Sequence, residues 1–221
     1  MKVVYHGIDL RQFSPEVRDR LRVPARQTLG LSDGAFTLLL IGNDWKKKGF
    51  ASLLEALERL QDVPLHLLVV GRDDPTPFRT VLTRAGLDGR VAFLPPRRDV
   101  EFYYAAADCY VAPSLEDAFA LPVAEAMACG LPVIVSRSAG ASEIVTDGVD
   151  GLILEDPRDS VTLATLIRRL YEDPDLRSRL AAHAAQTAGA YTWEKAAGAM
   201  HDVFQEIIWS HKSRRRLPKA G

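Results

Sequence analysis

The 221-residue chain has little of the chemistry that covalent or metal-based sites need. It contains two cysteines, Cys109 and Cys129, without C-x-x-C spacing or a histidine nearby in sequence, and its five histidines are scattered. Both cysteines lie in apolar stretches, so we expect buried free thiols in preference to a disulfide or a pair of metal ligands. The sequence predicts no structural metal and gives no sign of a cofactor.

Long apolar runs and a strong net charge are also lacking. No segment has the length of a membrane span, and Lys2 and residues 5–7 interrupt the early apolar residues, so no signal-peptide pattern is formed. A cytoplasmic protein is therefore expected. The formal net charge is −1, but residues 211–221 hold five basic residues and no acidic one. We expect a solvated, disordered basic tail, with contact to anionic lipid at the inner face of a membrane, or to nucleic acid, as the alternative. No nucleic-acid partner is predicted for the chain as a whole.

What the sequence does contain is a regular alternation of apolar runs and helical patterns. Near-continuous apolar runs, typical of buried parallel strands, cover residues 35–42, 65–71, 90–94, 108–112, 131–136 and 152–154, and a shorter candidate strand covers residues 2–5. Helical spacing or helix-start signals cover residues 50–60, 78–85, 99–107, 122–129, 140–145, 158–172, 174–189 and 192–210, with Asp99 as the expected cap of the third. No repeat or linker divides this order. It predicts a single α/β domain with a doubly wound, Rossmann-like parallel sheet.

The segment from residue 113 to residue 130 carries the strongest functional pattern. A strand leads into a loop, and a helix is expected to begin near Pro122, since proline suits the first helical position. The N–H groups of that first turn favour anions, phosphate above all. Asp117 lies in the loop and Glu125 one turn into the helix, and carboxylates can accept hydrogen bonds from sugar hydroxyls. An ordinary acidic surface loop is the alternative interpretation.

A second candidate segment follows the strand at residues 35–42. Lys46, Lys47 and Lys48 lie in a polar loop just before a helix, at the end of a strand where open α/β sheets place their ligands. The sequence therefore favours an anion-binding loop, and a solvated lysine run is the alternative.

These two segments together resemble the family-4 retaining glycosyltransferases. Asp117, seven intervening residues, Glu125 and then A-M-A-C-G-L-P-V resemble the family signature E-G-F-G-L-P-x-x-E-A-M-A-x-G-x-P-V. Lys48 and Gly49 resemble the end of the family's R-x4-K-G pattern, with Asn43 where the arginine is usual. Further similar patterns extend the resemblance over about residues 3–207. Departures are Asp117 in place of the first glutamate, with Glu116 as a substitute candidate, and Ala118 and Ala120 in place of glycines.

The resemblance implies roles for individual residues. Lys48, with Lys46 or Lys47 as a second charge, would neutralise the donor's diphosphate, while Glu125 would hold ribose hydroxyls and Asp117 hexose hydroxyls. Further residues would line the nucleotide site: Asn43, Gly71 and Arg72 after two of the strands, Arg97 near the base, and Phe119, Ala120, Leu121 and Pro122 at the helix start. Arg97, like Arg98, is equally well explained as an exposed loop arginine.

The implied protein is the carboxyl-terminal, donor-binding lobe of a GT-B glycosyltransferase. It would occupy residues 1–210, with a boundary segment at 1–20 and a helix at 192–210 that crosses to the partner lobe and leaves apolar side chains such as Phe204 exposed here. The donor would be a UDP- or GDP-hexose, transferred with retention and without a metal to a sugar or lipid-linked acceptor, in polysaccharide or lipopolysaccharide biosynthesis. The acceptor would bind mostly on an amino-terminal lobe, so this chain alone is expected only to bind donor. A degenerate nucleotide-binding or protein-interaction module is the alternative, and a different GT-B enzyme is a second one.

Overall fold

Six parallel strands form the centre of the molecule. The computed structural model describes residues 2–32 and 34–215, with side chains described as far as residue 209. The strands lie in the order β3-β2-β1-β4-β5-β6, and each pairs in parallel with its neighbours. Their bounds are β1 (Phe36–Ile41), β2 (Leu65–Val70), β3 (Val91–Leu94), β4 (Cys109–Ala112), β5 (Val133–Ser136) and β6 (Leu152–Leu154). The central strands are buried on both faces of the sheet, which explains why their sequences are nearly continuous apolar runs.

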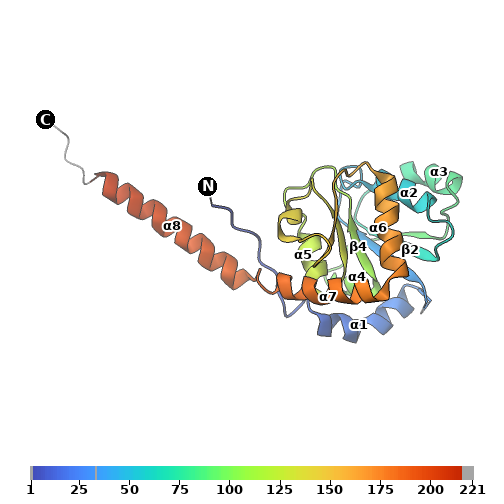
Figure 1. The fold of residues 1–221 in the computed structure, drawn as a ribbon, viewed down its shortest axis with the longest axis horizontal. Helices are drawn as coiled ribbons and strands as arrows, with labels where there is room; N and C mark the ends of the chain where they lie inside the picture. The colour runs from blue at the N-terminus through green and yellow to red at the C-terminus, as the bar shows by residue number, and fades with distance from the viewer. Residues whose placement is uncertain (1, 33, 216–221) are drawn as a thin grey trace.

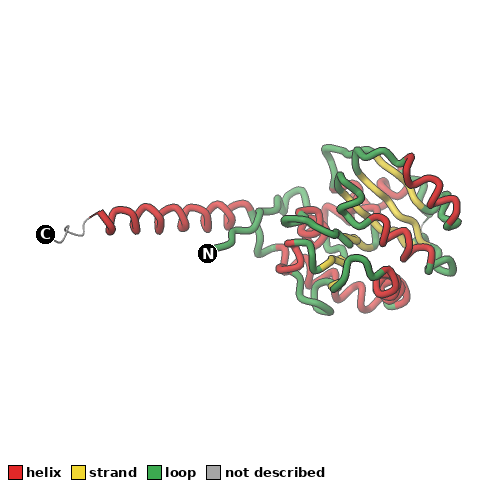
Figure 2. The backbone as a smooth tube through the Cα atoms, turned by 90° about the horizontal axis from the view of Figure 1, so that it is seen from above, coloured by secondary structure: helices red, strands yellow, loops and turns green. Residues whose placement is uncertain are grey.

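Helices cover both faces of this sheet (Figures 1 and 2). Side chains of α1 (Pro15–Thr28), α4 (Glu101–Ala106) and α5 (Leu121–Ala128) pack into the core on one face. Those of α2 (Phe50–Glu58), α3 (Thr76–Arg84) and α6 (Ser160–Glu172) pack into the core on the other face. Helix α7 (Pro174–Ala188) contributes to both cores, and the short 3-10 helix η1 (Gly140–Ile144) packs beside α5. The predicted doubly wound α/β fold is confirmed.

The structure differs from the sequence prediction near the amino terminus. Residues 2–7 form no strand. They lie instead against Phe119, the 3-10 helix η1 and the start of the last helix, and the Tyr5 hydroxyl donates to Glu143 in η1 at 2.5 Å. Helix α1 was not predicted, although Ser14 caps it by accepting the Val17 N–H at 3.3 Å. The interior Pro24 and the polar residues of this helix conceal its apolar spacing. Asp99 does not cap α4, because its carboxylate is held by Arg97.

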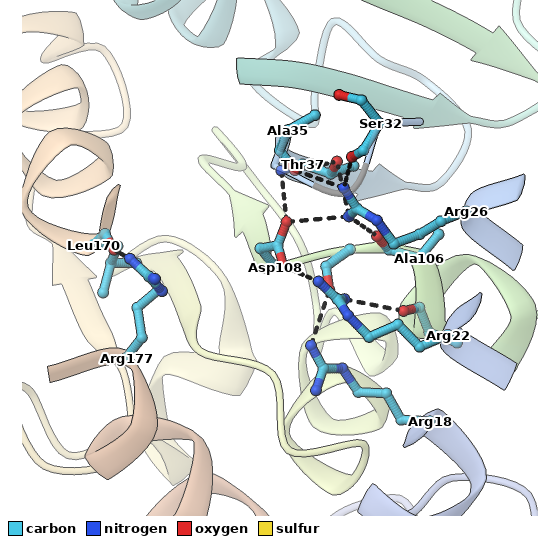
Figure 3. Close-up of polar contacts among 12 residues, drawn as sticks. Arg18, Arg22, Arg26, Ser32, Ala35, Thr37, Ala106, Asp108, Leu170 and Arg177 are labelled. Atoms are coloured by element: carbon cyan, nitrogen blue, oxygen red, sulfur yellow. Dashed lines mark hydrogen bonds and ion pairs between the residues drawn. The ribbon is translucent and has the colours of Figure 1, made fainter. Parts of the chain in front are cut away.

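Helix α1 is fastened to the amino-terminal edge of the sheet by arginines spaced four residues apart (Figure 3). Arg22 and Arg26 both pair with Asp108, the residue before β4. The buried Arg26 also donates to the carbonyl oxygens of Ala35 and Ala106, at 2.8 and 2.9 Å. These bonds fix the start of β1 relative to the start of β4. They lie at the edge opposite to the loops that follow these strands.

Helix α8 (Trp193–Arg215) projects away from the sheet (Figure 1). Its start is capped as predicted, since the Thr192 hydroxyl accepts the Lys195 N–H at 3.3 Å. The helix continues past its predicted end at Ser210, so the first part of the expected disordered tail is helical, and residues 216–221 lie outside the described residues. The apolar side chains expected to be exposed are exposed: Phe204, Ile207, Ile208 and Trp209. Within the described part of the chain, no helix combines the length and apolarity that a bilayer crossing requires.

Candidate functional site

The strand order places the two candidate loops next to each other. Strands β1 and β4 are neighbours, and the order of the chain reverses between them, with β2 and β3 on one side and β5 and β6 on the other. The loop 42–49 follows β1 and the loop 113–120 follows β4. Both loops therefore leave the carboxyl edge of the sheet at the switch point, where doubly wound α/β proteins bind ligands.

Direct contacts hold these loops together. The Leu115 N–H donates to the Lys47 carbonyl at 2.7 Å, and the two side chains Lys47 and Glu116 approach to 3.7 Å. Gly49 has a φ of +71°, and a Cβ at this position would lie 1.8 Å from the Pro113 oxygen. Only glycine fits both the conformation and the contact, so Gly49 lets the lysine loop lie directly against the strand-β4 loop.

Lys48 and Asp117 form an ion pair across the two loops. Their side chains are 20% and 13% exposed, so the pair is largely removed from solvent. The other carboxylate oxygen of Asp117 accepts the N–H groups of Ala120 at 2.8 Å and Phe119 at 3.3 Å. Asp117 thus closes the turn that leads into α5. The N–H groups of the two residues just before the helix, Phe119 and Ala120, are therefore bonded to this carboxylate.

The Asp117 loop is also held from the far side. The Gly140 N–H donates to the Asp117 carbonyl at 3.0 Å, and the Ala141 N–H donates to the Phe119 carbonyl at 2.6 Å. A Cβ on Gly140 would lie 2.1 Å from the Ala118 oxygen. The loop between β5 and η1 therefore fixes residues 117–119 in position.

Helix α5 begins at Leu121, near Pro122 as predicted, and Pro122 is its second residue. Ala120, which precedes it, has a φ of +63°, a left-handed conformation that glycine adopts with less strain. Alanine in place of the family's usual glycine therefore strains the backbone at this position. The Phe119 side chain is half-buried between the rings of Tyr5 and His6.

Glu125 lies in the first turns of α5, where the buried Tyr104 hydroxyl donates to its carboxylate at 2.7 Å. Burial raises the pKa of Glu125, and the bond from Tyr104 opposes this shift only in part. The hydroxyl of Tyr110 on β4 donates to the Ile41 carbonyl at 3.3 Å, and burial raises the pKa of this phenol, with a smaller contribution from the negative charges of Glu125 and Asp117. Lys48 and Asp117 are therefore in direct contact, and Glu125 lies in the first turns of the helix that follows the Asp117 loop. The binding roles of these three residues stay predictions.

The remaining predicted residues after β1 and β2 are engaged with each other. The Asn43 side chain accepts the Arg72 N–H at 3.0 Å, and the Asp73 carboxylate accepts the N–H groups of Asp44 and Trp45 at 3.1 and 2.7 Å. A Cβ on Gly71 would lie 2.4 Å from the Gly42 oxygen, so close packing against Gly42 explains the glycine at this position. The Arg72 side chain is exposed. Asn43 therefore supports the shape of the lysine loop.

Two predicted cationic residues are exposed. Lys46 points to solvent from the lysine loop. Arg97 pairs with Asp99, and its guanidinium lies 4.1 Å from the centre of the Phe102 ring. Their binding roles stay predictions.

Three residues that shape the site were not singled out from the sequence. Tyr104 holds Glu125, Asp73 holds the lysine loop, and Gly140 admits the Asp117 loop. Tyr104 lies in a Y-x-x-A-D pattern, and Gly140 begins a segment that resembles the family's G-G-x-x-E-I-V pattern. Asp73 gives no signal in sequence that separates it from an ordinary loop residue. Their roles depend on contacts between segments far apart in the chain.

Both cysteines are buried and free, as predicted. Among the side chains that the structure describes, in residues 2–32 and 34–209, no group of three or more His, Cys, Asp or Glu is placed to hold a metal ion. What the switch point presents is a lysine, backbone N–H groups and two carboxylates. This combination defines a doubly wound α/β protein whose site suits a ligand that carries both negative charge and hydroxyl groups.

Comparison with known proteins gives the family. Residues 24–187 match the family described as Glycosyl transferases group 1, and the chain belongs to it. A D-inositol 3-phosphate glycosyltransferase from Xylanimonas cellulosilytica is 36% identical over 212 residues, which is 92% of this chain and 51% of that protein. The chain spans about half the length of the curated relatives it matches.

Solved structures of glycosyltransferases share the fold of this chain. Anabaena HepE in complex with UDP-glucose is 28% identical with a TM-score of 0.82, and the match covers 93% of this chain and 57% of HepE. The carboxyl-terminal domain of LpcC, a group 1 glycosyl transferase from Francisella tularensis, has the same fold: it is 24% identical with a TM-score of 0.73, and the match covers 85% of this chain and 100% of that domain. The fold is therefore that of the carboxyl-terminal half of a GT-B glycosyltransferase.

Proposed function

We propose that this chain is the donor-binding lobe of a retaining, metal-independent glycosyltransferase that uses a UDP- or GDP-hexose. The observation that carries the proposal is the contact of Lys48 with Asp117 beside the start of α5, at the switch point of the sheet. Glu125 follows in the first turns of the same helix. The relative HepE, whose structures hold UDP and UDP-glucose, supports a uridine donor.

Charge neutralisation is the main chemical task of such a site. When the hexosyl group moves, the bond between its anomeric carbon and the diphosphate oxygen breaks and a bond to the acceptor oxygen forms. Negative charge gathers on the leaving diphosphate, which takes up the proton of the acceptor hydroxyl. Fixed positive groups aimed at that diphosphate stabilise the transition state, and here Lys48, with Lys46 or Lys47, supplies them together with the α5 start. Because these groups carry the positive charge, the proposal needs no metal ion.

The two carboxylates provide recognition of hydroxyls. In this proposal Glu125, held by the Tyr104 hydroxyl, accepts hydrogen bonds from the ribose, and Asp117 accepts them from the hexose. The acceptor is proposed to be a sugar or a lipid-linked sugar, and the names of relatives add a phosphorylated inositol as a candidate. Its site is inferred to lie largely in the half of those relatives that this chain does not match.

For the complete enzyme we infer a cytoplasmic location, at the inner face of a membrane where the acceptor is lipid-linked, and a role in polysaccharide or lipopolysaccharide synthesis. For these 221 residues alone we expect nucleotide binding with little or no transfer.

A thermal-shift and calorimetric screen with UDP, GDP, ADP and their hexose conjugates tests the donor assignment. We expect stabilisation by one nucleotide class, with affinity reduced about tenfold or more by Lys48→Ala, since a charge-assisted phosphate contact is worth about 1.5–3 kcal/mol. Glu125→Ala is expected to weaken nucleotide binding through the ribose. Lys195→Ala on α8 removes the same charge away from the site and serves as the matched control. Unchanged shifts in both site variants would show that the site assignment is wrong.

A degenerate binding module is the second candidate function. The engagement of Asn43 by Arg72, and of Lys48 by Asp117, favours it, because both groups already have partners within the chain. Absence of heat with every nucleotide in the screen supports this candidate in its partner-only form.

A further inference from the structure

Asp117 lies where the positive groups of the proposed diphosphate site converge, and its own carboxylate satisfies them. One oxygen pairs with the Lys48 ammonium, and the other accepts the N–H groups of Ala120 at 2.8 Å and Phe119 at 3.3 Å. An ammonium together with adjacent backbone N–H groups at a helix start is a typical set of donors for a phosphate oxygen. The anion subsite is therefore built, and a side chain of the same chain fills it.

We propose that Asp117 is an internal anion of the diphosphate subsite, which the donor must displace from Lys48 in order to bind. This inference rests on the proposed function and assigns Asp117 a second role, as the residue that sets donor affinity. When a competent state exists only after a side chain has moved, the apparent affinity falls by the fraction of molecules in that state. Asp117 thus acts as a positioning residue for Lys48 before it contacts any sugar.

The surroundings enforce this ion pair. The Lys48 stem lies against Gly42, so closely that a Cβ on that glycine would be 2.8 Å from the Lys48 Cε. The Asp117 backbone is fixed by the loop that contains Gly140, as described above. The neighbouring pair of Lys47 with Glu116 is different, because its atoms are 3.7 Å apart and its side chains are 59% and 79% exposed. Lys48 and Asp117 are held in contact by packing, whereas the neighbouring pair is a solvated surface contact.

Displacement also connects the two roles of Asp117. A diphosphate carries more charge and more acceptor oxygens than a carboxylate, so it can replace Asp117 at Lys48 and at the N–H groups. The released carboxylate remains in the same loop, beside the position where the hexose attached to that diphosphate would lie. There it can accept hydrogen bonds from the sugar hydroxyls.

The variant Asp117→Asn tests this inference in the full chain. An amide keeps the shape, and its oxygen can still accept the N–H groups of Phe119 and Ala120, but it cannot pair with the Lys48 ammonium. We expect the dissociation constant for UDP, measured by calorimetry, to fall about tenfold because the competing anion is gone. We also expect the melting temperature without ligand to fall, because Lys48 loses its partner. If Asp117 had a purely structural role, Asp117→Asn would lower both the melting temperature and the affinity for UDP.

Glu116→Gln is the matched control, since it removes the same charge from the adjacent, exposed residue. Its UDP affinity is expected to stay within about twofold of the unmodified chain. Equal tightening by Glu116→Gln, or a UDP affinity of Asp117→Asn that is unchanged or weaker, would overturn the inference and leave the proposed function standing. GDP and ADP are titrated in the same way, and absence of binding by all three nucleotides to every protein would overturn both.

Discussion

At the scale of single residues, Glu125 shows how a functional group can cost stability. Its carboxylate is largely withdrawn from water, with one hydrogen bond from Tyr104, and burial raises its pKa above the ordinary value of 4.5. The folded protein therefore binds this proton more tightly than the unfolded chain does. At a pH below the pKa of Glu125 in the unfolded chain, this residue does not lower the free energy of unfolding. The free energy of unfolding then decreases as the pH rises through the pKa that Glu125 has in the folded protein.

Glu125→Gln is expected to remove this cost. The amide oxygen can still accept from Tyr104, so at about pH 8 the melting temperature should rise by a few degrees, where about 1 kcal/mol corresponds to roughly 2–4 °C. At about pH 4 the gain should vanish, because the wild-type carboxyl is then protonated as well. The same variant should bind nucleotide more weakly, since it loses a charged acceptor for the ribose. Scanning calorimetry at both pH values measures the effect, with the exposed Glu116→Gln as control, and a lower melting temperature at pH 8 would refute the cost assigned to the buried charge.

The positions of the candidate site residues in the fold could be predicted from the sequence, but the contacts between their side chains could not. Lys48, Asp117 and Glu125 could be placed in one region, because each follows or begins an element whose position in a doubly wound sheet is fixed by topology. That Lys48 pairs with Asp117 could not be predicted. The pair depends on how Gly42 and Gly140 admit the two loops, and these contacts join segments far apart in the chain.

At the scale of elements, the site depends on how closely two loops approach. Gly49 is the narrowest point, because a Cβ there would lie 1.8 Å from the Pro113 oxygen, and no flexible side chain can move aside to relieve this contact. The approach positions both Lys48 and the start of α2. We therefore expect the geometry of the loops to be lost before the fold itself.

Gly49→Ala should separate the two loops. Gly86 provides the matched control: its φ of +66° resembles the +71° of Gly49, but nothing lies within 4 Å of a Cβ built there. Gly86→Ala should cost about 1 kcal/mol, from the left-handed backbone alone. Gly49→Ala should cost about 3 kcal/mol or more and abolish nucleotide binding. Urea unfolding and calorimetry with UDP measure both effects, and similar losses in the two variants would show that the approach to Pro113 is not critical.

Element prediction succeeded where burial gives a simple pattern. The strands β1, β2, β4 and β5 are buried on both faces, so their apolar runs identify them. Helix α1 was missed because one of its faces is polar yet packed: Arg26 is buried through bonds to Asp108 and to backbone carbonyls. The spacing of apolar residues does not predict a helix whose packed face is held by hydrogen bonds and ion pairs of arginine side chains.

At the scale of the whole molecule, α8 is the feature that the sheet domain does not explain. It extends from the domain (Figure 1), and Met200, Phe204 and Ile208 recur at spacings of four residues, so they share one face. Phe204 is 57% exposed and Ile208 47% exposed. An apolar helix face of this kind usually marks a surface that contacts another molecule or another part of a larger assembly.

We expect the 221-residue chain to associate through this face, in a concentration-dependent manner that sedimentation velocity can follow. Replacing Phe204 and Ile208 together by Glu should shift the distribution toward the monomer, because association would then bury two charges. The melting temperature should change little, since exposed positions typically contribute within about 0.5 kcal/mol. His201→Glu with Gln205→Glu introduces two acidic residues at exposed polar positions of the same helix and should leave association nearly unchanged. If instead the apolar pair of substitutions destabilises the fold as a core substitution does, the face is covered by the chain's own domain in solution, and the projecting arrangement of α8 is wrong.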